Sequence, residues 1–281
     1  MKFSLFKEYG ALNSKPVFEA FEHSLREAGH QIEQNNMYSD VAVIWSVLWN
    51  GRMKQNRDVW KHYRKNNRNV IVLEVGGIAR GKTWKVGLNG VNRSAYFGPM
   101  DNNSDRSNTL GLKLKPWSKD GEYILICGQH EKSLQWENMP RMSSWVMKII
   151  DQLQTYYDYP IVFRPHPRSR LEHIERQYKN VYRQEPSKIP NTYDDYDMNF
   201  DRVKFTISWN SNPGVHSIIN GVPAYVGPDS LAFDVACKDL IMIDNPDMPD
   251  RQQWLNDYAW TEYTIEEIAS GLPLSRLTNR L

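Results

Sequence analysis

The sequence predicts an α/β protein made of two parallel-sheet domains. Short apolar runs rich in β-branched residues alternate with amphipathic stretches of helical period, a pattern typical of parallel sheets covered by helices. The alternation begins at the N-terminus and restarts after a polar segment, KLKPWSKDGE at 113–122, that contains Pro and Gly. We therefore expect an N-terminal domain over 1–117 and a C-terminal domain over 118–281, with the last helix packing back on the N-terminal domain.

The first half is expected to run β-α-β-α-β. Strands are predicted at 1–6, 40–45 and 69–74, and helices at 16–29 and 53–65. In the first helix, Val17, Phe21 and Leu25 share one face, and Ser14 stands just ahead of it as a candidate cap.

The second half repeats the alternation. Strands are predicted at 123–127, 161–163, 203–207, 224–226 and 240–243, and helices at 144–156, from 169 toward 178, and at 214–220. The helix from 169 is predicted because Ser169 and Glu172 have the spacing of a capping box.

Composition indicates a water-soluble protein. Hydrophobic residues make up 40% of the chain and charged residues 24%. The longest apolar run, 41–49, is interrupted by Ser46, and the N-terminus becomes charged at Lys7, so we expect no membrane partner. Two cysteines suggest neither a metal site nor a disulfide framework, and we expect a cytoplasmic protein.

Positive charge is concentrated in the first half. Residues 1–115 hold 18 Lys and Arg against 10 Asp and Glu, and the segment 52–68 alone holds seven against one, with Trp60 and Tyr63 interleaved. Such a surface suits a phosphate backbone, although a solvated helix face is an equally good interpretation. The candidate contacts to double-stranded DNA are Arg52, Lys54, Arg57, Lys61, Arg64, Arg80, Lys82, Lys85 and Arg93.

The stretch GGIARGKT, 76–83, matches the G-x-x-x-x-G-K-[ST] pattern of a nucleotide-binding loop. A strand is expected before it, but the following WKVGLNGVN alternates polar and apolar residues and has glycines at 87 and 90. The helix that such a loop needs is therefore not predicted, and an ATPase or kinase is the weaker hypothesis.

Three predicted strands of the second half end in turns suited to bind a phosphate group. They are followed by Gly-Gln-His at 128–130, Arg-Pro-His-Pro-Arg at 164–168 and a small-residue turn that opens a helix at 211–216. Because parallel strands end at the same edge of a sheet, we expect the three turns to meet there. The candidate donor-binding residues are Gly128, Gln129, Arg164, His166, Arg168, Ser211, Asn212, Gly214, His216, Ser217, Asp229 and Ser230.

The motif RPHP, followed about 40 residues later by S-x-x-G-x-[EH]-x-x-x-x-G-x-P, resembles the donor domain of capsule-polysaccharide-type GT-B glycosyltransferases. The resemblance spans roughly 120–245 and implies two Rossmann-like domains that face a cleft. It also implies a nucleotide-sugar co-substrate, expected to be a UDP-sugar, with no metal or other cofactor. His216 stands where that family usually has a ribose-binding Glu.

A glycosyltransferase of the inverting type needs a base that takes the proton of the acceptor hydroxyl. Glu74, at the end of a predicted strand, is the first candidate, although an ion-paired strand-end role is open. Asp101 and Glu8 are the alternatives.

The basic first half also resembles, in overall style, phage transferases that glycosylate hydroxymethylpyrimidines such as hydroxymethylcytosine in DNA, as arabinosyl- or glucosyltransferases. That resemblance implies a bacteriophage enzyme in the host cytoplasm with DNA as acceptor. A surface polysaccharide as acceptor, and a non-catalytic nucleic-acid-binding protein, are the alternatives.

Overall fold

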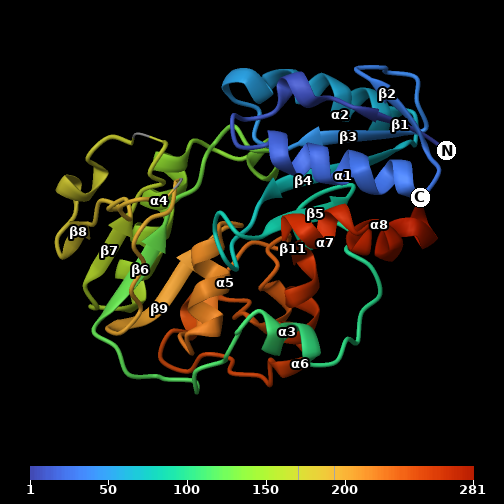
Figure 1. Ribbon diagram of the computed structural model, residues 1–281. Helices are drawn as coiled ribbons and strands as arrows, with labels where there is room; N and C mark the ends of the chain where they lie inside the picture. Colours follow the sequence, from blue (N-terminus) through green and yellow to red (C-terminus); the bar gives the residue numbers. More distant parts are fainter. Residues whose placement is uncertain (170, 193) are drawn as a thin grey trace. The chain divides into compact units, whose positions relative to one another are not determined.

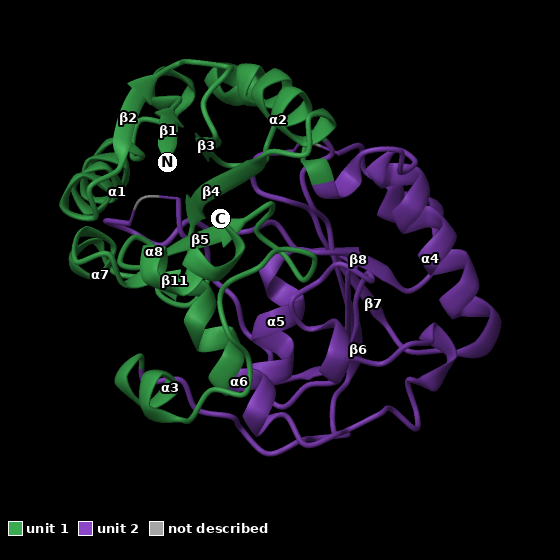
Figure 2. Cartoon of the chain, turned by 90° about the vertical axis from the view of Figure 1, so that its right-hand side faces the viewer, with its two compact units in different colours: residues 1–110, 132–134, 256–281 green, residues 111–131, 135–255 purple. Residues whose placement is uncertain are grey.

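The computed structural model describes residues 1–169, 171–192 and 194–281. Within them the chain forms two compact units, coloured separately in Figure 2. Unit 1 contains 1–110, 132–134 and 256–281, and unit 2 contains 111–131 and 135–255. Each unit is built on its own mainly parallel sheet (Figure 1), which confirms the predicted α/β class.

Unit 1 holds a six-stranded sheet of order β11-β5-β4-β3-β1-β2. Its parallel strands are β1 (Lys2–Leu5), β2 (Gln31–Gln34), β3 (Val41–Trp45) and β4 (Asn69–Val75). The antiparallel additions are β5 (Trp84–Leu88) and β11 (Glu262–Tyr263). Its helices are α1 (Lys15–Glu27), α2 (Asn56–Lys65), α3 (Asp105–Thr109), α7 (Ile265–Ala269) and α8 (Leu272–Leu277).

Both faces of the unit 1 sheet are buried, which explains why β3 is apolar at every position. Val43 and Trp45 face one core, which includes Phe18 and Phe21 of α1. Ala42 and Ile44 alternate with them and face a second core, which includes Tyr63 of α2. A strand buried on both faces therefore reads as a continuous apolar run.

Unit 2 holds a five-stranded parallel sheet of order β10-β9-β6-β7-β8. The strands are β6 (Tyr123–Cys127), β7 (Ile161–Arg164), β8 (Val181–Arg183), β9 (Val203–Ser208) and β10 (Ala224–Tyr225). Its helices are α4 (Met142–Tyr156) and α5 (Asn212–Ile219), and the chain leaves this unit within α6 (Gln252–Tyr258). Helix α4 packs Trp145, Ile149, Ile150 and Leu153 on the sheet.

Several expected elements differ from the structure. Residues 240–243 do not form a strand, because Leu240–Met242 is a 3-10 helix started by the Asp239 carboxylate, which accepts from the Ile241 amide. The prediction of a helix from 169 to 178 is also wrong in its length. Among the described residues of this stretch, only Ile174–Gln177 is helical, and it forms a 3-10 turn. Arg170, inside that stretch, lies outside the described residues.

Two details concern the ends of elements and units. Ser14 occupies the N-cap position of α1, but its side chain makes no capping hydrogen bond. The chain leaves unit 1 after Leu110, whereas the predicted boundary is at 117, and residues 256–281, which include the last helix, belong to unit 1. Across the described ranges, every helix is too short or too polar to cross a bilayer.

Candidate functional site

Three strand ends meet at the carboxyl edge of the unit 2 sheet, hereafter the unit 2 edge. The amide of Gly128, after β6, donates to the Arg164 carbonyl at the end of β7 over 2.9 Å. Gln129 is almost fully buried, and its Oε1 accepts from the Asn210 amide, after β9, at 2.8 Å. The turns that sequence reasoning singled out are thus joined by direct hydrogen bonds.

The loop after β7 presents His166 at this edge. Its Nδ1 accepts from the Arg168 amide at 3.1 Å, so the neutral imidazole carries its proton on Nε2. The ring lies edge-on to His130, with centroids 5.6 Å apart. A cavity of about 360 Å³ opens beside this loop, lined by Pro165, His166, Pro167, Ser169, Leu171, His173, Arg183 and Glu185. The loop therefore places the His166 ring next to an open cavity.

Arg164 is placed differently from the other predicted donor-binding residues. Its buried guanidinium donates to the backbone carbonyl of Asp197 and, at 2.9 Å, to the Asp197 carboxylate. That hydrogen bond holds the pKa of Asp197 below its ordinary value. Arg168 is more exposed and forms an ion pair with Asp194 at 3.2 Å. In this structure, Arg164 serves to anchor the segment around Asp197.

The turn after β9 leads into α5, whose N-cap is Ser211 in an extended conformation. The Ser211 hydroxyl lies 2.9 Å from that of Ser208 and makes no bond to the helix amides. Gly214 allows close packing here, because a Cβ would lie 2.8 Å from the Val226 side chain. The positive end of α5 is thus held against the end of β9.

Two predicted donor-binding residues point into the protein instead. Ser217 is fully buried, and its hydroxyl donates to Thr206 Oγ1 at 2.8 Å and contacts the Val222 carbonyl. Ser230 is buried, and its hydroxyl accepts from the Ala232 amide. Both were predicted from sequence position, which does not show on which side of a helix or turn a side chain lies. Asn212, His216 and Asp229 are partly exposed.

At the carboxyl edge of the unit 1 sheet, hereafter the unit 1 edge, Glu74 is held in a defined orientation. Its Oε2 lies 2.5 Å from the Ser46 hydroxyl, and its Oε1 accepts from the Val75 amide at 2.8 Å. Ser46 follows β3 with a φ of 64°, a conformation that is costly for residues other than glycine, and its Oγ also accepts from the Leu48 amide. A strained buried serine therefore positions a partly exposed carboxylate.

Lys85 is buried beside Glu74, which makes the predicted contact of Lys85 with DNA wrong. It is the cross-strand partner of Glu74 on one side and of Glu262 on the other, so the three side chains share one face of the sheet. Burial lowers the pKa of Lys85, and the charges of Glu262 and Glu74 oppose that shift. Its exposed fraction is 5%, so no external ligand reaches it.

The GGIARGKT loop binds the protein's own carboxylate. The amides of Gly77 and Ile78 and the hydroxyl of Thr83 donate to Glu262 at 2.6, 2.9 and 2.7 Å. Gly76 is required because a Cβ would lie 2.3 Å from Glu262 Oε2. Strand β5 follows instead of a helix, and the donors that a phosphate would need are used by Glu262. Both observations argue against a nucleotide-binding loop.

The remaining predicted acceptor-side residues lie on the surface of unit 1. Glu8 and Asp101 are exposed, and Asp101 has a φ of 61°. Arg80 is partly exposed, and the exposed basic residues are Arg52, Lys54, Arg57, Lys61, Arg64, Lys82 and Arg93. Helix α2 buries Val59 and Tyr63 and turns its charged positions outward, as a surface helix does.

Sequence reasoning missed Ser46 and Glu262. Ser46 was visible as the polar interruption of the longest apolar run. Glu262 gave no signal, because it lies far along the chain from the loop that it binds. In the described ranges, no three His, Cys, Asp or Glu side chains are grouped to hold a metal ion.

The sequence matches no protein-family model and no curated protein. Among solved structures, the fold is similar to that of the Thermosulfurimonas dismutans KpsC beta Kdo 2,7 transferase, with a TM-score of 0.51 and 13% identity. The match covers 98% of this chain and 100% of that chain. The KpsC beta Kdo 2,4 transferase of the same organism aligns with a TM-score of 0.47 and 11% identity over 97% and 98% of the two chains. The first of these two matches shows a shared fold over nearly the whole of both chains.

Proposed function

We propose that the chain is a glycosyltransferase that moves a sugar from a nucleotide-activated donor to a saccharide hydroxyl. The observation that carries this proposal is the meeting of three strand ends at the unit 2 edge, linked through Gly128, Gln129 and Asn210. Open parallel sheets bind ligands at such edges. Similarity over nearly the whole chain to the fold of a transferase supports the same class of reaction.

Unit 2 is assigned the donor. His166 Nε2, the Ser211 hydroxyl and the positive end of α5 are suited to hold a diphosphate, since each supplies a donor or a partial positive charge. Gln129 would fix their spacing by bridging β6 and β9. A UDP-sugar is the first donor to test, and a nucleotide-activated Kdo is the second because the similar structure is a Kdo transferase.

Unit 1 is assigned the acceptor and its activation. The acceptor hydroxyl oxygen forms a bond to the anomeric carbon while the bond from that carbon to the phosphate oxygen breaks. The nucleotide leaves with the bonding electron pair, and the Glu74 carboxylate takes the hydroxyl proton. Glu74 suits this role because it is partly exposed at a strand end and two hydrogen bonds fix its orientation.

A saccharide acceptor is favoured over DNA because the similar structure is a Kdo transferase. DNA stays the second candidate on one specific observation: the exposed basic residues of α2 and its preceding turn, Arg52, Lys54, Arg57, Lys61 and Arg64. The comparisons give this second candidate no support.

The proposal is tested by incubating the protein with labelled nucleotide sugars and three acceptors: bacterial surface polysaccharide, hydroxymethylcytosine-containing duplex DNA and unmodified duplex DNA. Transfer to the polysaccharide, lost in Glu74→Gln, is the expected result. Transfer to modified DNA alone would establish the second candidate. Salt-sensitive DNA binding with no transfer from any donor would indicate a nucleic-acid-binding protein and overturn the proposal.

A further inference from the structure

A second pocket lies at the opposite edge of the unit 2 sheet, where β7 and β8 begin. It has a volume of about 500 Å³, inside the range of about 300–1,000 Å³ usual for ligand sites. The pocket, hereafter the Tyr182 pocket, is lined by Gln154, Tyr157, Asp158, Tyr159, Lys179, Asn180 and Tyr182. Because His166 follows the carboxyl end of β7, this pocket is separate from the cavity at the unit 2 edge.

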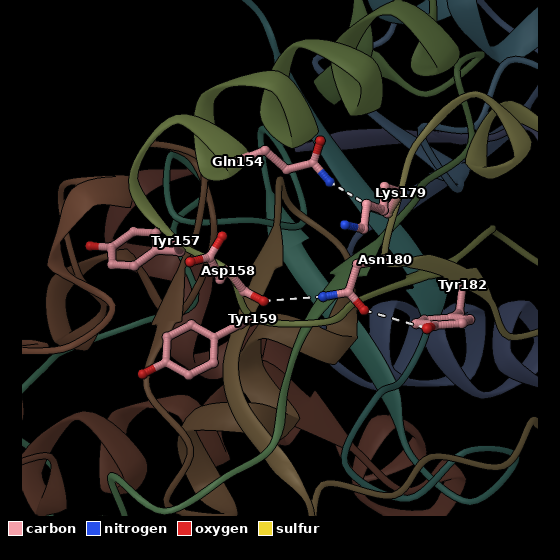
Figure 3. A pocket seen from close by; sticks show the side chains of 7 residues that line it. All are labelled: Gln154, Tyr157, Asp158, Tyr159, Lys179, Asn180 and Tyr182. Carbon is pink, nitrogen blue, oxygen red and sulfur yellow. Dashed lines mark hydrogen bonds between the residues drawn. The ribbon is translucent and has the colours of Figure 1, made fainter.

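Aromatic rings flank the pocket on two sides (Figure 3). Tyr157 and Tyr159 lie on one side with ring centroids 6.2 Å apart, and their hydroxyls bond the Ile241 carbonyl and the Asp244 carboxylate. Tyr182 lies on the other side, on the edge strand β8, and is 57% exposed. The hydroxyl of Tyr182 donates to Asn180 Oδ1 at 3.4 Å, so all three rings are held through their hydroxyls and the Tyr182 ring stays largely exposed to solvent.

Polar groups between the rings keep hydrogen-bonding capacity. The side-chain amide of Asn180 donates to the backbone carbonyl of Asp158 at 3.1 Å, and the side-chain amide of Gln154 donates to the backbone carbonyl of Lys179 at 2.7 Å. Within the described residues, the Asp158 carboxylate, the Lys179 ammonium and Gln154 Oε1 make no hydrogen bond to the protein. In Figure 3 Asp158 lies beside Tyr157 and Tyr159, and Gln154 and Lys179 lie close to each other. They offer both acceptors and donors to one ligand.

We propose that the Tyr182 pocket is a second saccharide-binding site, which holds a part of the acceptor polysaccharide distant from the reacting sugar. A sugar ring presents hydroxyls at its rim and C–H bonds on its faces, which match the polar centre and the aromatic walls. The proposal rests on the proposed function, which supplies the acceptor, but saccharide binding here does not require catalysis.

The charge of the pocket favours a saccharide over a polyanion. Asp158 and Lys179 bring one negative and one positive charge, so the lining has no net charge to attract a phosphate backbone. Tyr182 supplies an exposed ring, and sugar faces pack on such rings without any charge. The expected ligand is therefore a neutral, hydroxyl-rich segment of a polysaccharide.

The test uses the labelled full chain on a printed array of bacterial polysaccharides that also carries duplex DNA, with no nucleotide sugar present. The wild-type protein is expected to bind at least one neutral polysaccharide. Tyr182→Ala should weaken that binding at least tenfold, and Tyr182→Phe should retain it because the ring remains. Tyr38→Ala is the matched control, since Tyr38 is 82% exposed in unit 1 and should not affect binding.

Binding only to DNA, no binding to any polysaccharide, or equal binding by Tyr182→Ala would overturn the proposal. Transfer to a short acceptor is measured in parallel and should be unchanged in Tyr182→Ala. If no protein transfers sugar but the array signal depends on Tyr182, the proposed function fails and the saccharide site stands. If transfer occurs and the array signal does not depend on Tyr182, only the saccharide site fails.

Discussion

The two sheet edges are built by different means. At the unit 1 edge, charged side chains are buried in a row, with Lys85 between Glu74 and Glu262, and only Glu74 reaches the surface. At the unit 2 edge, backbone amides and the neutral Gln129 side chain link short turns, and the buried Arg164 guanidinium is bonded to Asp197. The first arrangement suits the orientation of one reactive carboxylate, and the second suits a ligand that accepts many hydrogen bonds.

The difference predicts that the two edges respond differently to mutation. Losing a buried charge leaves its partners unpaired, so variants in the unit 1 row should affect stability or rate strongly. Losing one neutral contact at the unit 2 edge should affect ligand affinity moderately.

The largest effect is expected for Glu262→Ala. It leaves the amides of Gly77 and Ile78 and the Thr83 hydroxyl without their acceptor and removes a negative charge beside the buried Lys85, at a cost of about 3–5 kcal/mol in the free energy of unfolding. Urea denaturation measures this. Glu27→Ala, at an exposed position of α1, is the control and should change stability by less than about 0.5 kcal/mol. Equal stability of the two variants would show that the buried row does not stabilise unit 1.

Glu74→Gln should lower kcat by about 100-fold or more while the melting temperature stays near that of the wild type, because the amide cannot take the acceptor proton. Steady-state kinetics with a saturating donor measures this. Glu8→Gln and Asp101→Asn are the controls, and Asn suits the positive φ of position 101. A comparable loss in Asp101→Asn, with normal activity in Glu74→Gln, would move the base to Asp101.

Gln129→Ala should raise the donor KM about tenfold, a change of about 1.4 kcal/mol, with a smaller effect on kcat. The substitution removes the acceptor of the Asn210 amide and loosens the link between the β6 and β9 ends. Gln177→Ala, exposed in the same unit, is the matched control. An unchanged donor KM in Gln129→Ala would exclude this link from the donor site.

The smallest effect concerns the pH dependence set by Asp197. The hydrogen bond from Arg164 lowers the pKa of Asp197 in the folded state, so its contribution to stability is present above the unfolded pKa and is lost as the pH falls through the folded pKa. Asp197→Asn should therefore be less stable than the wild type at pH 7 and approach it below about pH 4. Because the Asp197 side chain is 53% exposed, the difference should be small and should shrink in salt. Denaturation at several pH values checks this, and a difference that grows toward low pH would contradict it.

The sequence predicted the strands that carry the turns because each is a short apolar run with a clear end, as in 123–127 and 203–207. It did not predict β8 or β11, which are only three and two residues long and gain their pairing from neighbours distant in sequence. It placed Glu74 at a strand end, but not the burial of Lys85 beside it. That burial depends on β11, whose partner strand lies far away along the chain.

Contacts between distant segments also decide which of the predicted donor-binding side chains point into the protein. Turn chemistry placed Gly128, His166 and Ser211 at one edge, because parallel strands end together. It did not show that Ser217 is buried whereas Ser211 lies at the edge, because packing decides which side of a short helix faces the core. The sequence also did not show what GGIARGKT binds once a nucleotide was disfavoured: its amides do bind an anion, and that anion is Glu262.

Binding of a nucleotide-activated sugar at the unit 2 edge can be measured by thermal denaturation with a series of nucleotide diphosphates and nucleotide sugars. A ligand that binds only the folded state raises the melting temperature by mass action. We predict that at least one nucleotide sugar stabilises the wild type, and that His166→Ala and Gln129→Ala lose most of this effect while Glu74→Gln retains it. Stabilisation by none of the ligands, or equal stabilisation of His166→Ala and Gln129→Ala, would contradict binding at this edge.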